Sequence, residues 1–181
     1  MDTSAPQLGK YARFERERRF LLAGLPPDLS SDAPHTMIED RYLPGTRFRL
    51  RCMTESSSGL VTRKLTQKYA PAPGAFARTV ITNSYLTPHE YALFATLPAD
   101  VLRKDRYGYV VDGQVYAIDR FRGALEGLVL AEIELGSDEA LDAFQRPAFA
   151  LADVTDDEGF TGGALCRCSF ADLAPALARA E

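Results

Sequence analysis

The 181-residue sequence predicts an α+β protein that is mainly β, an eight-stranded antiparallel barrel with a charged interior and a few flanking helices. Two observations predict this fold class. Eight strand-like runs follow one another at hairpin spacing, and charged side chains recur at every second position within most of them. The composition, 46% hydrophobic and 25% charged, is ordinary for a globular protein. We expect residues 1–10 to form a flexible tail and residues 11–181 to form one domain.

The expected elements are separated by loops rich in Pro, Gly, Ser or Asp. The strands are Tyr11–Leu22, Thr36–Leu43, Arg47–Met53, Leu60–Tyr69, Ala75–Tyr85, Leu102–Val111, Gln114–Phe121 and Leu128–Leu135. Asp112 and Gly113 supply a two-residue hairpin turn between two of them. The expected helices begin after the N-caps Thr87 and Ser137, the first ending near Leu97, and a third covers about Ala171–Ala180.

Several classes of function are disfavoured by composition. With 21 Lys and Arg against 25 Asp and Glu, the net charge of −4 argues against general attraction to nucleic acid or to anionic membranes. No apolar run is long enough to cross a bilayer, and the N-terminus lacks the apolar stretch of a secretory signal. The three cysteines and two histidines do not have the spacing of a zinc site. We therefore expect a cytoplasmic protein with reduced thiols.

Charged side chains collect on one face of each strand, because residues two apart share a face. Most strands carry one sign of charge. The rows are Glu15, Glu17 and Arg19; Arg47, Arg49 and Arg51; Lys64 and Lys68; Lys104 and Arg106; Asp119; and Glu132 and Glu134. The opposite faces are often apolar, as with Phe48, Leu50 and Cys52 beside the three arginines.

Two arrangements of these strands remain open on periodicity alone. In a half-exposed sheet the charges face water, which suits any single strand, but solvated faces usually alternate in sign to form cross-strand pairs. In a closed barrel with the charges inside, eight inward bases exceed five inward acids by three. A confined excess of positive charge needs an anion. Arg and Lys suit phosphate, and carboxylates suit Mg²⁺ or Mn²⁺, so a polyphosphate with a divalent metal satisfies both sets.

Short motifs between about residues 11 and 168 resemble, in order, the CYTH family of triphosphate tunnel metalloenzymes. None of them is specific alone, and their succession carries the resemblance. They are ERERRFLL from Glu15, DRYL at Asp40–Leu43, RLR at Arg49–Arg51, LTQK at Leu65–Lys68, RKDR at Arg103–Arg106, AIDRF around Asp119, LAEIEL around Glu132 and Glu134, and DVTDDEGFT from Asp153.

The resemblance implies a tunnel open at both ends that binds a triphosphate moiety together with Mg²⁺ or Mn²⁺. It implies that bases contact phosphate and that glutamates hold metal and position water, with Arg19 completing the catalytic group. Lys64 joins the bases by strand parity, and Asp119 is either a metal ligand or a partner of a base. The implied phosphate contacts are Arg49, Arg51, Lys68, Lys104 and Arg106, and the implied metal ligands are Glu15, Glu17, Glu132 and Glu134.

Three departures from the family pattern affect these roles. Arg19 stands where the family usually has Lys, and because Arg keeps its proton it suits a phosphate clamp but not a proton donor. The strand TVITNSYL, which follows Arg78, lacks the glutamates that many relatives carry there, which leaves Arg78 as an additional expected phosphate contact. Near the C-terminus, Glu158 occupies a position that is basic in the family.

The resulting expectation is a divalent-metal-dependent hydrolase of inorganic tripolyphosphate or a related triphosphate compound. One alternative is an adenylate cyclase, for which Tyr42, Phe76 and Tyr107 would wall a nucleoside pocket, although the same residues suit plain packing. Another is a non-catalytic module that binds phosphorylated metabolites. In each case the expected partner is a small molecule and not nucleic acid or a membrane, and the expected protein is a monomer or a homodimer.

Overall fold

The computed structural model describes residues 9–177, so most of the expected N-terminal tail lies outside the described residues. The strands are β1 (Arg13–Leu22), β2 (His35–Tyr42), β3 (Phe48–Glu55), β4 (Val61–Tyr69), β5 (Arg78–Tyr85), β6 (Asp100–Val111), β7 (Gln114–Phe121), β8 (Val129–Glu134) and β9 (Ala152–Asp153). The α-helices are α1 (Pro88–Phe94), α2 (Asp138–Ala143), α3 (Gly162–Leu165) and α4 (Ala174–Leu177). Short 3-10 helices cover Gly123–Leu125, Glu158–Phe160 and Phe170–Leu173.

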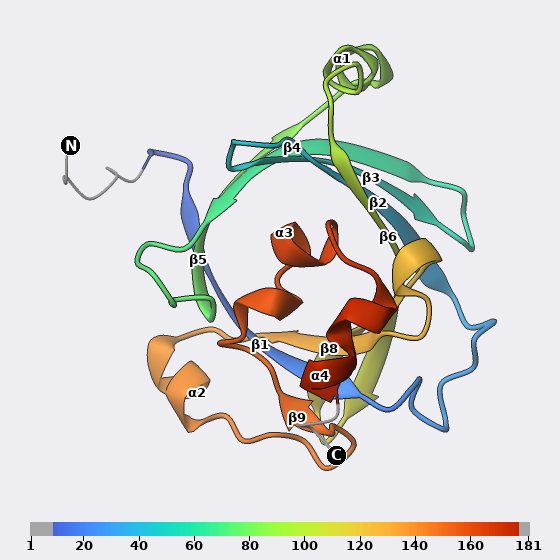
Figure 1. Ribbon diagram of the computed structural model, residues 1–181, viewed down its shortest axis with the longest axis vertical. Helices are drawn as coiled ribbons and strands as arrows, with labels where there is room; N and C mark the ends of the chain where they lie inside the picture. The colour runs from blue at the N-terminus through green and yellow to red at the C-terminus, as the bar shows by residue number, and fades with distance from the viewer. Residues whose placement is uncertain (1–8, 178–181) are drawn as a thin grey trace.

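Eight of these strands form a closed antiparallel barrel, as expected. Their order around the ring is β1, β5, β4, β3, β2, β6, β7 and β8, and Figure 1 looks through the ring. The ring closes on β1, whose first half pairs with β5 over Arg13–Arg16 and whose second half pairs with β8 over Glu17–Leu22. Closure leaves no long unpaired edge and separates an inner face from an outer face on every strand.

The helices differ more from the expectation than the strands do. Thr87 caps α1 and Ser137 caps α2 as predicted, but α1 ends at Phe94 and not near Leu97. The expected C-terminal helix is a 3-10 turn followed by α4, and residues 178–180 of it lie outside the described residues. The two-residue strand β9 and the helical turns between Glu158 and Leu165 were not predicted.

The outer faces of β1, β6, β7 and β8 are apolar and covered. Phe20, Tyr107, Ile118 and Ala131 are fully buried in one cluster beneath loop residues on the outside of the barrel. Tyr107 therefore belongs to this outer packing and cannot wall a nucleoside pocket in the bore. Among residues 9–177, no helix has the length and apolar character needed to cross a membrane.

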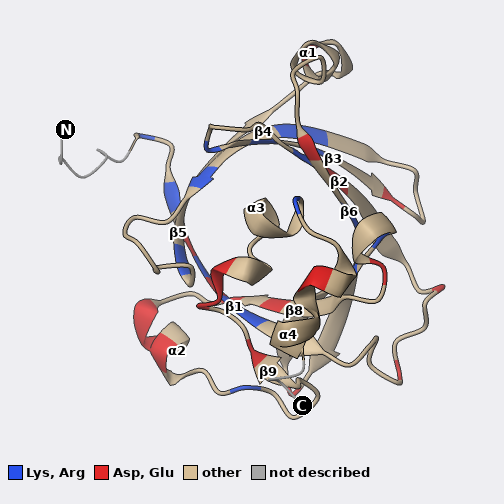
Figure 2. Cartoon of the chain, viewed as in Figure 1, with Lys and Arg blue, Asp and Glu red and all other residues tan. Residues whose placement is uncertain are grey.

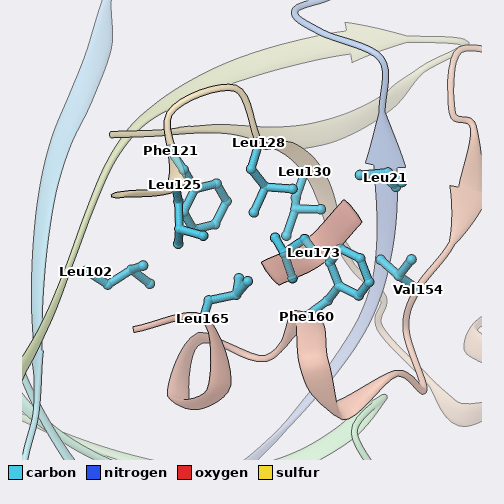
Figure 3. Packing of buried hydrophobic residues seen from close by; sticks show 10 residues of the cluster. All are labelled: Leu21, Leu102, Phe121, Leu125, Leu128, Leu130, Val154, Phe160, Leu165 and Leu173. Carbon is cyan, nitrogen blue, oxygen red and sulfur yellow. The ribbon is translucent and has the colours of Figure 1, made fainter. Parts of the chain in front are cut away.

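The C-terminal segment enters one end of the barrel. Figure 1 shows α3 inside the ring of strands, and Figure 3 shows Phe160 and Leu165 packed against apolar side chains of the barrel. Leu102 and Phe121 supply two of these side chains, and all four are at most 3% exposed. Gly163 and Arg167 of this segment also line the cavity that remains, so the segment narrows this end of the expected tunnel. Its inward residues are apolar, so they bury themselves against a segment of the chain and not against water.

Candidate active site inside the barrel

A cavity of about 510 Å³ occupies the rest of the bore, and charged side chains line it. Nine bases and five acids contribute, which leaves a positive excess. The bases are Arg19, Arg47, Arg49, Arg51, Lys64, Lys68, Lys104, Arg106 and Arg167; the acids are Glu15, Glu17, Asp100, Glu132 and Glu134. The structure thus brings together all the predicted site residues except Arg78 and Asp119.

The strand register sorts these charges onto two walls. On the β3–β4 side Arg51 lies directly opposite Lys64, and on the β1–β8 side Glu17 lies directly opposite Glu134. Figure 2 shows the basic colour on β3 and β4 and the acidic colour on β8. Like charges at directly opposed positions repel each other. Each wall therefore favours a ligand of the opposite charge, an anion at the basic wall and a cation at the acidic wall.

Three bases of the bore are already paired with the acidic wall. Lys68 Nζ donates to Glu15 Oε2 and to Glu17 Oε2 at 2.8 Å each. Glu132 accepts from Arg19 Nε at 3.1 Å and from Arg106 Nη2 at 2.5 Å. Burial alone would raise the pKa of Glu132, but the charges of Lys104, Arg106 and Arg19 hold it well below its usual range.

Asp119 is buried behind the cavity wall and holds two bases in place. Its side chain is 1% exposed, and its carboxylate accepts from Lys104 Nζ at 2.5 Å and from Arg106 Nε and Nη2 at 2.7 and 2.6 Å. These contacts favour the second of its two expected roles, the partner of bases, because little acceptor capacity is left for a metal ion.

Asp40 is a buried counter-ion that the sequence reasoning missed. It lies on β2 with its side chain 1% exposed, and it accepts from Arg51 Nε and Nη2 at 2.6 Å each, while Arg49 Nε lies 3.4 Å away. Burial raises the pKa of Asp40, but Arg49 and Arg51 outweigh that effect and hold it below its ordinary value. The inward face of β2 also carries Ile38 and Tyr42, so no charge row marked it.

Lys64 has no such partner, since no carboxylate among residues 9–177 forms an ion pair with it. Burial, followed by the positive charges of Arg51 and Arg49, lowers the pKa of Lys64 to about 8. The nearby guanidinium of Arg49 is also incompletely satisfied, because its buried Nε finds no hydrogen-bond partner in the described residues. This part of the basic wall is the place where a bound anion would gain most.

Binding of tripolyphosphate is expected to take up a proton at Lys64. At about pH 8.5 a lysine with a pKa near 8 is mostly neutral, and an adjacent polyanion restores its proton by raising the pKa. Calorimetric titrations without divalent metal, in buffers of different ionisation enthalpy, measure this uptake. The wild-type protein should take up more protons than Lys64→Met, and equal uptake by the two proteins would contradict the assignment.

The same shift has a consequence for the ligand-free protein. Because the pKa of Lys64 in the folded protein lies below the ordinary value of 10.5, the unfolded chain binds more protons between about pH 8 and 10.5. The contribution of Lys64 to folding stability therefore rises with pH across that window, and Lys64→Met should remove this rise.

Arg78 lies outside the bore, so the expectation that it contacts phosphate is wrong. Its Nε donates to Asp138 Oδ1 at 2.7 Å and its Nη2 to Asp142 Oδ1 at 2.5 Å, both on α2. On β5 the neighbouring inward position is Thr79, and Arg78 pairs in register with Arg16, which also bonds Asp138. Strand parity places Arg78 on the outer face, where an acidic helix neutralises it.

The four glutamates suit a divalent metal by their chemistry. Carboxylate oxygens are the ligands that Mg²⁺ and Mn²⁺ prefer, and the facing carboxylates of Glu17 and Glu134 would be relieved by a cation between them. Within residues 9–177 no three His, Cys, Asp or Glu side chains converge as a ready ligand cluster. The reason is that Glu15 and Glu17 turn toward Lys68, and Glu132 turns toward two arginines.

Comparison with known proteins points to one activity. No protein-family model matches the chain. An inorganic triphosphatase of Nitrosomonas europaea is 28% identical over 154 residues, which are 83% of this chain and 95% of that protein. An inorganic triphosphatase of Acetivibrio thermocellus is 36% identical over 67 residues, 37% of this chain and 42% of that protein. The crystal structure of the inorganic triphosphatase NE1496 matches with a TM-score of 0.55 and 23% identity, covering 84% of this chain and 93% of that one, so the fold is shared.

Proposed function

We propose that the chain belongs to the CYTH family of triphosphate tunnel metalloenzymes and that it hydrolyses inorganic tripolyphosphate, or a related triphosphate compound, with a divalent metal ion. The observation that carries the proposal is the opposition of two walls in one cavity. A basic wall, whose Lys64 forms no ion pair with a described carboxylate, faces a wall of glutamates, and a metal-bound polyphosphate is the ligand that neutralises both.

The basic wall would bind and orient the phosphates. Arg49 and Arg51 offer guanidinium forks already aligned by Asp40, and Lys64 adds a point charge on β4 opposite Arg51. Lys68, Lys104 and Arg106 also line the cavity, where they can stabilise the negative charge that develops on the phosphate oxygens. Because their counter-ions hold them in position before substrate arrives, little reorganisation is needed on binding.

The acidic wall would supply the metal and the water. A divalent cation such as Mg²⁺ or Mn²⁺, held by Glu15, Glu17, Glu132 and Glu134, would neutralise charge on the phosphate oxygens. Arg19 lies in this wall, paired with Glu132 at 3.1 Å. Burial would lower the pKa of Arg19, but Glu132 and Glu17 raise it, so Arg19 stays charged and acts as a clamp and not as a proton donor.

The chemical step is the attack of water on a terminal phosphorus. The new P–O bond forms as the anhydride P–O bond breaks in line with it, and pyrophosphate and orthophosphate leave. The proton of the attacking water passes to a carboxylate of the acidic wall. Glu134 suits this role, because it lines the cavity and no Lys or Arg of residues 9–177 forms an ion pair with it.

Incubation of the full chain with tripolyphosphate and Mg²⁺ or Mn²⁺ tests the proposal. We expect equal amounts of orthophosphate and pyrophosphate, and no hydrolysis once a chelator is added. Incubation with ATP distinguishes the adenylate cyclase, which would release cyclic AMP and pyrophosphate without orthophosphate. Thermal stabilisation by tripolyphosphate without turnover, under each metal, would overturn the hydrolase and favour a binding module.

A further inference from the structure

The mouth of the cavity carries two exposed arginines that lie outside the phosphate-binding set described above. Arg47 belongs to the β2–β3 connection, and Arg167 follows α3 in the C-terminal segment; both line the cavity. Among residues 9–177 neither guanidinium forms an ion pair with a carboxylate. The mouth is thus positively charged on two of its sides.

The guanidinium of Arg47 lies over an aromatic ring at this mouth. The Arg47 carbonyl accepts from Lys68 N at 3.1 Å, which fixes its backbone to the end of β4. Its guanidinium carbon lies 4.3 Å from the centre of the Tyr69 ring, and Tyr69 also lines the cavity. This stacking fixes the cation at the mouth and covers a ring face on which a nucleobase could otherwise stack.

Arg167 faces the same opening from the C-terminal segment. Its Nε and Nη2 donate to the carbonyl oxygen of Gly163 at 3.1 and 2.8 Å, which leaves Nη1 for a ligand. The neighbouring Gly162 is tightly packed, because a Cβ there would lie 1.9 Å from Tyr42 Oη. Tyr42 also lines the cavity, so its hydroxyl lies where α3 and the bore meet.

We propose that Arg47 and Arg167 are specificity-determining residues, which select substrates whose phosphate at the mouth is unesterified, namely inorganic polyphosphate, over nucleoside and other organic triphosphates. This inference rests on the proposed triphosphatase function. In tripolyphosphate the phosphate nearest the mouth is a chain end and carries an additional negative charge. In an organic triphosphate the same phosphate is esterified, lacks that charge, and brings a bulky group against Arg47 on Tyr69.

Steady-state hydrolysis of tripolyphosphate and of ATP, with the same metal, tests the inference in Arg47→Ala and Arg167→Ala. We expect each change to lower the ratio of kcat/KM for tripolyphosphate to that for ATP by about tenfold, the size of one charge-assisted contact to phosphate. Arg63→Ala is the matched control, because Arg63 lies 5.9 Å from the Tyr91 ring in a similar stack that does not line the cavity. Its ratio should equal that of the wild-type protein.

An unchanged ratio in both mouth variants, or equal losses for the two substrates, would overturn the inference while leaving the triphosphatase function intact. If the wild-type protein hydrolyses neither compound, the proposed function is wrong. The specificity inference is then tested by comparing the binding of tripolyphosphate with the binding of ATP. In that case the melting temperature should rise more with tripolyphosphate than with ATP, and Arg47→Ala should reduce the difference. No difference in the wild-type protein would overturn the inference as well.

Discussion

The Arg51→Ala protein is expected to fold but to lose about 10²–10³-fold in kcat/KM for tripolyphosphate, the usual cost of removing one preorganised charge-stabilising group. Arg51 is 9% exposed in its side chain and is clamped by two hydrogen bonds of 2.6 Å to Asp40. The fold should survive because Arg49 remains 3.4 Å from the Asp40 carboxylate. Initial rates with Mg²⁺ or Mn²⁺, together with the melting temperature, measure the two effects separately.

Arg78→Ala serves as the control for Arg51→Ala. Both substitutions remove an arginine from a barrel strand, but Arg78 points outward and pairs with α2. We expect the activity of Arg78→Ala to stay within about twofold of the wild-type value, since surface ion pairs contribute little. If the two variants lost activity equally, the inward-facing charge row would not be the catalytic feature of this barrel.

The barrel and most of its charged bore follow from the sequence, because a strand has a side-chain period of two. Once Arg49 and Arg51 share a face, the apolar residues between them must share the other, and closure of the sheet decides which face is inside. The same parity explains the error at Arg78. Thr79, the next residue on β5, lines the bore. Because successive side chains of a strand point to opposite faces, Arg78 must point outward.

The filling of one end of the barrel could not be predicted in the same way. Its short helical turns between Glu158 and Leu165 bury Phe160 and Leu165, but these two apolar residues show no extended periodicity. Leu102 and Phe121 looked like ordinary strand positions, and only the closed barrel gives them a common space to fill. Such packing depends on contacts between distant segments, which local patterns do not specify.

Asp40 shows how a missed counter-ion alters the electrostatics of the bore. The nine bases that line the cavity exceed the five acids by four, and the buried Asp40 and Asp119 behind the wall reduce that excess to two. The bases of the bore therefore repel one another less than a count of the cavity-lining charges alone indicates. The excess that remains is concentrated at Lys64 and at the mouth, where ligands enter.

Asp40→Asn is accordingly expected to destabilise the fold strongly. The amide keeps the shape of the side chain but removes the charge that neutralises Arg51 and Arg49, and breaking a buried ion pair on one side costs about 3–5 kcal/mol. Chemical denaturation of the ligand-free protein measures the loss. Asp142→Asn, which removes an exposed partner of Arg78, is the control and should change the free energy of unfolding by less than about 1 kcal/mol.

Two further measurements on Asp40→Asn separate the lost charge from a merely altered shape. Because the pKa of Asp40 is lowered in the folded protein, the Asp40 carboxylate stabilises the fold fully above pH 3.8, the ordinary pKa of an aspartate. This stabilisation is lost as the pH falls through the folded-state pKa. Asp40→Asn should therefore lose less stability than the wild-type protein over that acidic range. Tripolyphosphate should also stabilise the variant more than the wild-type protein, because its charge replaces the missing carboxylate beside the two guanidinium groups. Wild-type stability in Asp40→Asn, with no added response to tripolyphosphate, would show that the arginines of the basic wall do not need a counter-ion and would remove the electrostatic argument for an anion in this bore.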